Sequence, residues 1–162
     1  MKTRFRLSIV ALCIAGVLAG CGSVTNGLAF QAPTGWTGTP AMFGRLQMWV
    51  KSGKDKGSTQ IVMLVKADAK NTKSDFTLIP SQYGNGKDMK MLSHGNTKLC
   101  GTQPAEQFVG EGTDKDGKKS RIEMVSTVVG SDRYVAMYMR PAVMSADPMA
   151  ESAIHSLCPE KQ

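Results

Sequence analysis

Apolar and polar residues alternate over most of the chain beyond position 44, a pattern that predicts strands with one buried face. It predicts a strand over 45–51 and, after a turn over 52–58, a partner strand over 59–67. Trp49 falls on the polar face of the first strand. The positions expected to point inward are Leu46, Met48, Val50, Ile61, Met63 and Val65.

The same alternation predicts four further strands, over 28–31, 105–110, 121–129 and 134–140. Between the second and third of these lies Asp116-Gly117, a pair that favours a tight hairpin turn. Trp36 is expected to be an early core residue. The stretch 68–96 is broken by glycine, proline and asparagine, so its pattern does not separate a strand from a short helix.

The last predicted element is a helix, because Asp147 is a good N-cap and Pro148 suits the first helical position. Pro159 is expected to end it. Its apolar face would consist of Met149, Ala150, Ala153, Ile154, Leu157 and Cys158. Several antiparallel strands with a C-terminal helix packed on them predict an α+β domain.

The chain contains three short motifs, Pro33-x-Gly35-Trp36, Cys100-Gly-Thr-Gln-Pro104-Ala105 and Ala150-x-x-x-Ile154-x-Ser156-Leu157-Cys158. They resemble motifs of PsbP-like domains, the fold of a photosystem II extrinsic protein. The resemblance covers Phe30 to Pro159, with a departure in the irregular stretch 68–96. It implies an antiparallel sheet flanked by helices that is used for binding and assembly.

At the N-terminus, Lys2, Arg4 and Arg6 precede an apolar run over 7–18, and Leu18-Ala19-Gly20-Cys21 closes it. This segment resembles a bacterial lipoprotein signal, in which those last four residues are the lipobox. The run is too short to cross a hydrocarbon core of about 30 Å, so we expect it to be removed. The resemblance implies a lipid on the Cys21 sulfur, which anchors the protein in a membrane. We therefore divide the chain into a signal peptide (1–20), a lipidated tether (21–27) and one domain (28–162).

Cleavage of the signal would lower the net charge of the chain, and export would place the chain outside the cytoplasm. The signal holds three of the twenty basic residues and no acid, so the mature chain carries seventeen basic and thirteen acidic residues, a formal charge of about +4. Outside the cytoplasm we expect an envelope protein or an anionic surface polymer as a partner, and no nucleic acid. Gly22 stands where an Asp often retains lipoproteins in an inner membrane, so we expect the outer membrane, facing the periplasm or the cell surface.

Of the four cysteines, Cys13 leaves with the signal and Cys21 is expected to carry the lipid, which leaves Cys100 and Cys158. In an oxidising envelope this pair predicts a disulfide. A reactive dithiol and a pair of metal ligands are the alternatives, but neither has its usual spacing here.

Two motifs suggest metals, and each has a simpler explanation. Met89, Met91 and His94 combine thioethers with an imidazole, a set that suits Cu(I), although methionines at alternating positions also fill core space. Asp114, Asp116 and Glu123 resemble part of a calcium loop, but Lys118 stands where a further oxygen ligand is needed. We therefore predict no bound metal and no cofactor.

No catalytic motif is present around His94 or His155, so we do not expect an enzyme. The leading hypothesis is a lipid-anchored envelope protein with a non-enzymatic binding or assembly role. Two alternatives stay open: a carrier of a small apolar or soft-metal ligand in a pocket lined by Met63, Met137 and Met139, and a hydrolase. A basic rim of strand ends is a second candidate binding surface, formed by Lys51, Lys54, Lys56, Lys66, Lys70 and Lys73.

Overall fold

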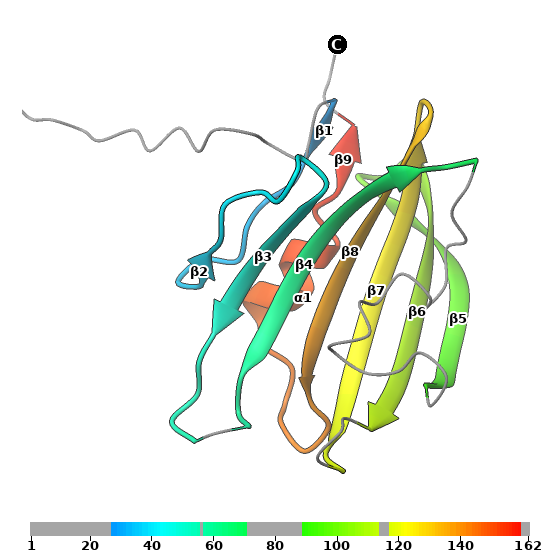
Figure 1. Cartoon of the computed structure of the whole chain (residues 1–162). Helices are drawn as coiled ribbons and strands as arrows, with labels where there is room; N and C mark the ends of the chain where they lie inside the picture. The colour runs from blue at the N-terminus through cyan, green and yellow to red at the C-terminus, as the bar shows by residue number, and fades with distance from the viewer. Residues whose placement is uncertain (1–26, 56, 71–88, 114–116, 160–162) are drawn as a thin grey trace, which may run out of the picture.

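A computed structural model describes residues 27–55, 57–70, 89–113 and 117–159 of the chain (Figure 1). These residues contain nine strands and one helix. In chain order the elements are β1 (Leu28–Ala29), β2 (Thr37–Gly38), β3 (Leu46–Lys51), β4 (Gln60–Asp68), β5 (Lys90–Leu99), β6 (Gln103–Thr113), β7 (Lys119–Val129), β8 (Asp132–Pro141), α1 (Pro148–Ile154) and β9 (Cys158–Pro159).

Seven of the strands form one antiparallel sheet in the order β2-β3-β4-β8-β7-β6-β5, and β1 pairs with β9 in a separate two-stranded sheet. The hairpin predicted from Asp116-Gly117 is confirmed as β6–β7, although Asp116 lies outside the described residues. Part of the unassigned stretch 68–96 belongs to β5, the strand at one edge of the sheet.

The predicted α+β class is wrong, because the described chain is a β-sheet protein with one helix of only seven residues. Where the PsbP-like resemblance implied several flanking helices, the described residues contain α1 alone. The reason is local. The period-two alternation of the sequence extends through strands of up to eleven residues, whereas the helical pattern is confined to one short segment.

The start of α1 is confirmed and its end is not. The Asp147 side chain accepts a hydrogen bond from the Met149 N–H, and Pro148 occupies the first turn. The helix ends at Ile154, after which both the N–H and the hydroxyl of Ser156 donate to the Ala153 carbonyl. Cys158 is therefore not helical but part of β9.

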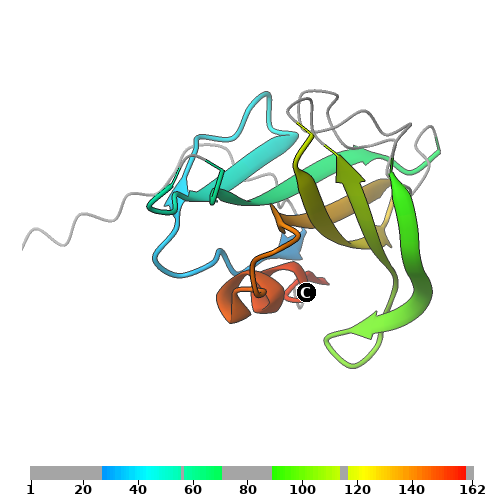
Figure 2. The same cartoon turned by 90° about the horizontal axis from the view of Figure 1, so that it is seen from below.

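Helix α1 lies against one face of the curved sheet, which we call the helix face (Figure 2). On this face Ala150 and Ile154 of α1 share a buried cluster with residues of the central strands. The residues of the large sheet in this cluster are Trp49, Val62, Leu64, Leu99, Ala105, Val125, Tyr134, Ala136 and Tyr138.

The opposite face, which we call the methionine face, is also buried at its centre. Cross-strand partners form one row across six strands: Met48, Met63, Met137, Met124, Phe108 and His94. Because β4 and β8 are covered on both faces, the assumption of one inward face failed there: Val62 and Leu64 are as fully buried as Met63. For the same reason the placement of Trp49 on a polar face was wrong.

Candidate functional site

Several connections meet at one end of the large sheet, which we call the tether end. Antiparallel pairing places there the start of β3, the end of β4, the turn between β7 and β8, and the hairpin 100–102 between β5 and β6. β1 and β9 lie at the same end, at the top of Figure 1. The first described residue, Gly27, directly precedes β1, so the chain that leads back to Cys21 leaves the domain here.

The tether end also holds a cleft of about 560 Å³. Strands β5, β6 and β7 supply most of its lining, and β8 supplies one residue, Arg133. The lining residues are Asn96, Thr97, Lys98, Gln103, Pro104, Ala105, Glu106, Ser126, Thr127, Val128 and Arg133.

Hydrogen bonds between neighbouring strands hold the part of the sheet that borders this cleft. The Gln103 amide donates to the Thr127 hydroxyl at 2.8 Å and to the Val128 carbonyl at 3.0 Å. The Thr127 hydroxyl in turn donates to the Pro104 carbonyl at 2.8 Å. They give Thr127, which is 2% exposed, its hydrogen-bond partners and tie β6 to β7 at this place.

Arg133 is the least exposed of the charged side chains in the cleft. Its Nη1 donates to the Ser126 hydroxyl at 3.0 Å and lies 4.0 Å from a carboxylate oxygen of Glu106. Its Nε is buried and has no hydrogen-bond partner among the described residues. With the exposed Lys98 on the rim, the cleft presents two cations, one acid and several amide or hydroxyl groups. Such a surface suits a polar ligand that offers both donors and acceptors, such as a sugar or a peptide segment.

A smaller cleft of about 160 Å³ lies at the same end, lined by Arg45, Lys66, Ala67, Asp68, Ser131 and Asp132. The Lys66 ammonium is 2.9 Å from the Asp132 carboxylate, and this hydrogen bond raises the pKa of Lys66. Because its lysine already has a partner, we consider this cleft a weaker candidate.

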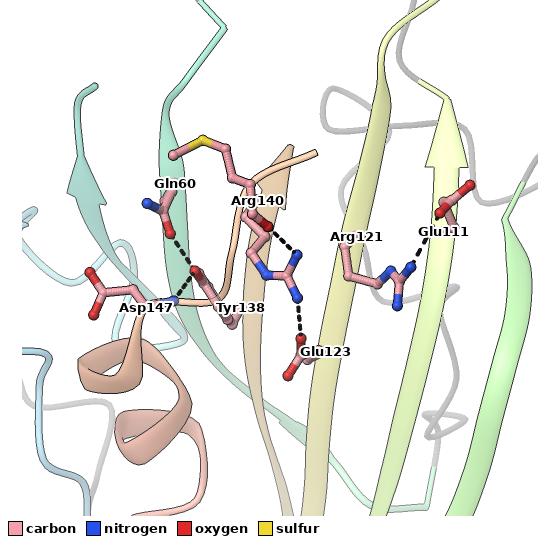
Figure 3. Close-up of polar contacts among 8 residues, drawn as sticks. Gln60, Glu111, Arg121, Glu123, Tyr138, Arg140 and Asp147 are labelled. Atoms are coloured by element: carbon pink, nitrogen blue, oxygen red, sulfur yellow. Dashed lines mark hydrogen bonds and ion pairs between the residues drawn. The ribbon is translucent and has the colours of Figure 1, made fainter. Parts of the chain in front are cut away.

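A row of polar contacts crosses the helix face (Figure 3). The Tyr138 hydroxyl donates to the Gln60 amide oxygen and accepts from the Asp147 N–H, while burial raises the pKa of Tyr138. Farther along the row, Arg140 pairs with Glu123 at 3.0 Å and Arg121 with Glu111 at 3.4 Å. Within the described residues these side chains bond to one another, so we interpret the row as structural, with Glu123 as an ion-pair partner of Arg140.

The predicted cysteine pair is brought together. Cys100 and Cys158 lie at disulfide-bonding distance, with their Cα atoms 5.8 Å apart. The bond joins the hairpin 100–102 to β9 and so holds the β1–β9 pair at the tether end. Cys21, the expected lipid site, lies outside the described residues.

Two of the copper candidates, Met91 and His94, share one face of β5, and Met89 directly precedes that strand. A β-bulge between Met91 and Ser93 shifts the register, so that Met91 and His94 stand opposite Gly110 and Phe108 on the methionine face. Met89, however, packs against the buried methionine cluster, and the His94 ring stacks on Phe108 with centroids 4.3 Å apart. The structure therefore gives two of the three side chains a packing role.

The proposed methionine pocket is filled by its own side chains. Met63 and Met137 are fully buried cross-strand partners, and Met139 is 7% exposed. Neither of the two clefts described above is lined by any of them. Packing, not ligand binding, is what the described residues support at this place.

The other predicted residues do not assemble into a site. Lys51 forms an ion pair with Asp147, and Lys66 forms one with Asp132. Two of the four rim lysines that the structure describes are therefore paired within the domain. Lys56, Lys73, Asp114 and Asp116 lie outside the described residues. His155 caps the end of α1, and no hydrogen bond links either histidine side chain to an acid or a hydroxyl within the described part of the chain.

Sequence reasoning did not find the cleft. The available signal was a pair of polar residues in core positions: Ser126 is 1% and Thr127 is 2% exposed, and Ser126 stands opposite Val135 of the methionine face. The partners of Ser126 come from elsewhere in the chain, so alternation alone does not reveal them.

No protein-family model matches the chain, and neither does any curated protein. Solved structures share its fold, and two of them illustrate the likeness. LpqN of Mycobacterium tuberculosis, described as involved in cell envelope biogenesis, is 16% identical, with 82% of this chain and 83% of that one covered at a TM-score of 0.55. PA94 of Pseudomonas aeruginosa, a protein of unknown function, is 9% identical, with 72% and 84% covered at a TM-score of 0.53. Within the described residues, no helix has the length and apolar character needed to cross a membrane.

Proposed function

We propose that this chain is a lipid-anchored, non-enzymatic binding protein of the cell envelope that holds a polar partner in the cleft around Arg133. The observation that carries the proposal is the shared position of the anchor and the cleft. Six peptide steps separate Cys21 from Gly27, which corresponds to at most about 20 Å of extended chain. A lipid on Cys21 would thus keep the tether end, and the cleft with it, close to the membrane surface.

The fold shared with LpqN supports the envelope setting, because that protein is described as involved in cell envelope biogenesis. The cysteine pair supports it as well, since disulfides form and persist in oxidising compartments. The lipobox adds the anchor and leads us to propose the outer membrane or the cell surface as the location.

The chemistry of the cleft supports binding rather than catalysis. Its charged groups, Lys98, Glu106 and Arg133, come with amide and hydroxyl groups that are bonded to one another, and it contains neither histidine nor cysteine. A nucleophile with an adjacent base is the minimum for covalent catalysis. We therefore propose a partner that is bound and not converted, either an envelope protein or a surface polymer.

Site-specific photo-crosslinking in the native envelope tests this function. A benzoylphenylalanine at Lys98, on the cleft rim, should give a discrete adduct, whereas the same group at the exposed Ser152 of α1 should not. Adding Arg133→Met should reduce the Lys98 adduct several-fold while the melting temperature shows that the domain stays folded. Equal labelling at Lys98 and Ser152 would contradict a binding role for the cleft. So would a Lys98 adduct whose yield is the same with and without Arg133→Met.

A further inference from the structure

The turn that leads into β3 exposes its largest apolar side chain to solvent. Phe43 is 95% exposed and the neighbouring Met42 is 49% exposed. The turn itself is well formed, since the Arg45 N–H donates to the Met42 carbonyl at 3.0 Å and the Met42 N–H to the Leu46 carbonyl at 2.7 Å. Phe43 is therefore presented on a fixed support.

The backbone of this turn does not suit the residue that occupies it. Phe43 has a φ of 52° and Gly44 a φ of 63°, and turns with two positive φ values strongly prefer Asn-Gly or Asp-Gly. A phenylalanine in the left-handed region is strained. Packing within the domain does not offset this strain, because almost the whole Phe43 side chain is exposed. Backbone strain without a structural benefit points to a function.

The surroundings of the turn indicate what it meets. It lies at the tether end, where the chain leads back to Cys21, and the Arg45 carbonyl accepts the Lys66 N–H at the end of β4. Arg45 and Lys70 are both exposed at this end, as is one acid, Asp68, while Asp132 is paired with Lys66. Apolar side chains beside cations match a bilayer interface that carries anionic headgroups.

We propose that the turn Met42–Arg45 inserts Phe43 into the membrane interface and so fixes the orientation of the anchored domain. This inference rests on the proposed lipid at Cys21. Two apolar side chains bind a bilayer too weakly to hold a protein alone, but the seven-residue tether 21–27 gives them a high effective concentration at the surface. With the turn inserted, the cleft at the tether end faces the membrane surface.

The chain offers a matched control for this proposal. Val143 is also 95% exposed, but it lies in the turn after β8, at the opposite end of the sheet. Full-length lipidated protein carrying Phe43→Trp or Val143→Trp is reconstituted into vesicles of phosphatidylcholine and phosphatidylglycerol, with and without bromine on the acyl chains. The wild-type protein supplies the background from Trp36 and Trp49.

We expect brominated chains to quench the added fluorescence of Phe43→Trp at least twofold and that of Val143→Trp not at all. Equal quenching of the two variants, or none in either, would overturn the insertion. The vesicles contain no protein partner. If the turn docks on a protein instead, Phe43→Trp should stay unquenched, and this result would overturn the proposed insertion.

A second measurement separates this inference from the anchor. Intact mass of the purified protein shows whether Cys21 carries lipid. A lipidated, vesicle-bound protein with unquenched Phe43→Trp overturns only the insertion, whereas a chain without lipid overturns the proposed anchor on which it rests.

Discussion

The Tyr138 hydroxyl accepts a hydrogen bond from the backbone N–H of Asp147 at 2.9 Å. Asp147 is the N-cap of α1, and Tyr138 is a fully buried residue of β8 at the centre of the sheet. The same hydroxyl donates to the buried Gln60 of β4. One oxygen atom thus connects the entry of the helix to two central strands.

Tyr138→Phe removes this connection while keeping the ring. We expect a loss of about 1–3 kcal/mol in the free energy of unfolding, because the Gln60 amide and the Asp147 N–H lose a partner in a buried setting. Urea denaturation of both proteins measures the loss. In the double variant with Gln60→Leu, the two losses should be clearly less than additive, and full additivity would mean that the hydroxyl and the amide do not act together.

The ion pair between Asp147 and Lys51 should make stability depend on pH. Its hydrogen bond from Lys51, at 2.6 Å, lowers the pKa of Asp147 below the ordinary value of about 4. A carboxyl whose pKa is depressed by folding contributes stability above its unfolded pKa, and this is lost as the pH falls through the folded pKa.

Asp147→Asn isolates this contribution, because asparagine still caps the helix. We expect the wild type to exceed the variant by about 0.2–1 kcal/mol at neutral pH, since the Lys51 side chain is half exposed. The difference should shrink below about pH 4. Denaturant unfolding of both proteins between pH 2 and 7 measures it, and a constant difference over this range would exclude the ion pair as its source.

What the sequence predicted well depends on local rules. The N-cap at Asp147 and the first-turn Pro148 involve neighbouring residues only, and the structure confirms both. The strands β3, β4, β6, β7 and β8 follow from alternation in the same way. Such signals need no knowledge of what lies across the sheet.

The predictions that failed concern residues whose burial or secondary structure depends on a segment far away in the sequence. The Phe30 ring packs against Trp49, with the two ring centroids 5.0 Å apart. The residues near Trp49 in the sequence do not predict this contact. Cys158 leaves the helical pattern because β9 pairs with β1, at the other end of the chain. The cleft joins Asn96 to Arg133 through three hairpins, so its composition is a product of the topology.

The copper motif provides a test of packing against coordination. Met89 packs into the buried cluster and His94 stacks on Phe108, so we expect Met89→Leu with Met91→Leu to leave the Cu(I) affinity unchanged. A competition titration with a chromophoric Cu(I) chelator measures it. A large fall in affinity would show that the bulge at Met91 and Ser93 builds a real site.

The lipid anchor is tested by Cys21→Ser. Only the cysteine thiol of the lipobox can take the thioether-linked lipid, so we expect the variant to keep its signal peptide and to leave the detergent phase on phase separation. Mass spectrometry of the wild type should show Cys21 as the lipidated first residue. Equal partitioning of the two proteins into detergent would exclude the lipobox interpretation.

The bond between Cys100 and Cys158 should matter for stability more than for binding. The two residues are 58 positions apart, and a loop of this length corresponds to about 4 kcal/mol on the chain-entropy model. Cys100 also has a φ of 51°, a conformation that few residues other than glycine and asparagine adopt readily, so the hairpin gains from being held. We expect reduction, or Cys100→Ala with Cys158→Ala, to cost about 2–5 kcal/mol in the free energy of unfolding.

Intact mass with and without a reductant tests the bond, and two free thiols in protein isolated from the envelope would refute it. The Lys98 crosslink should survive in any variant that stays folded, because neither cysteine lines the cleft, and its loss in a folded variant would instead assign the pair a role in binding.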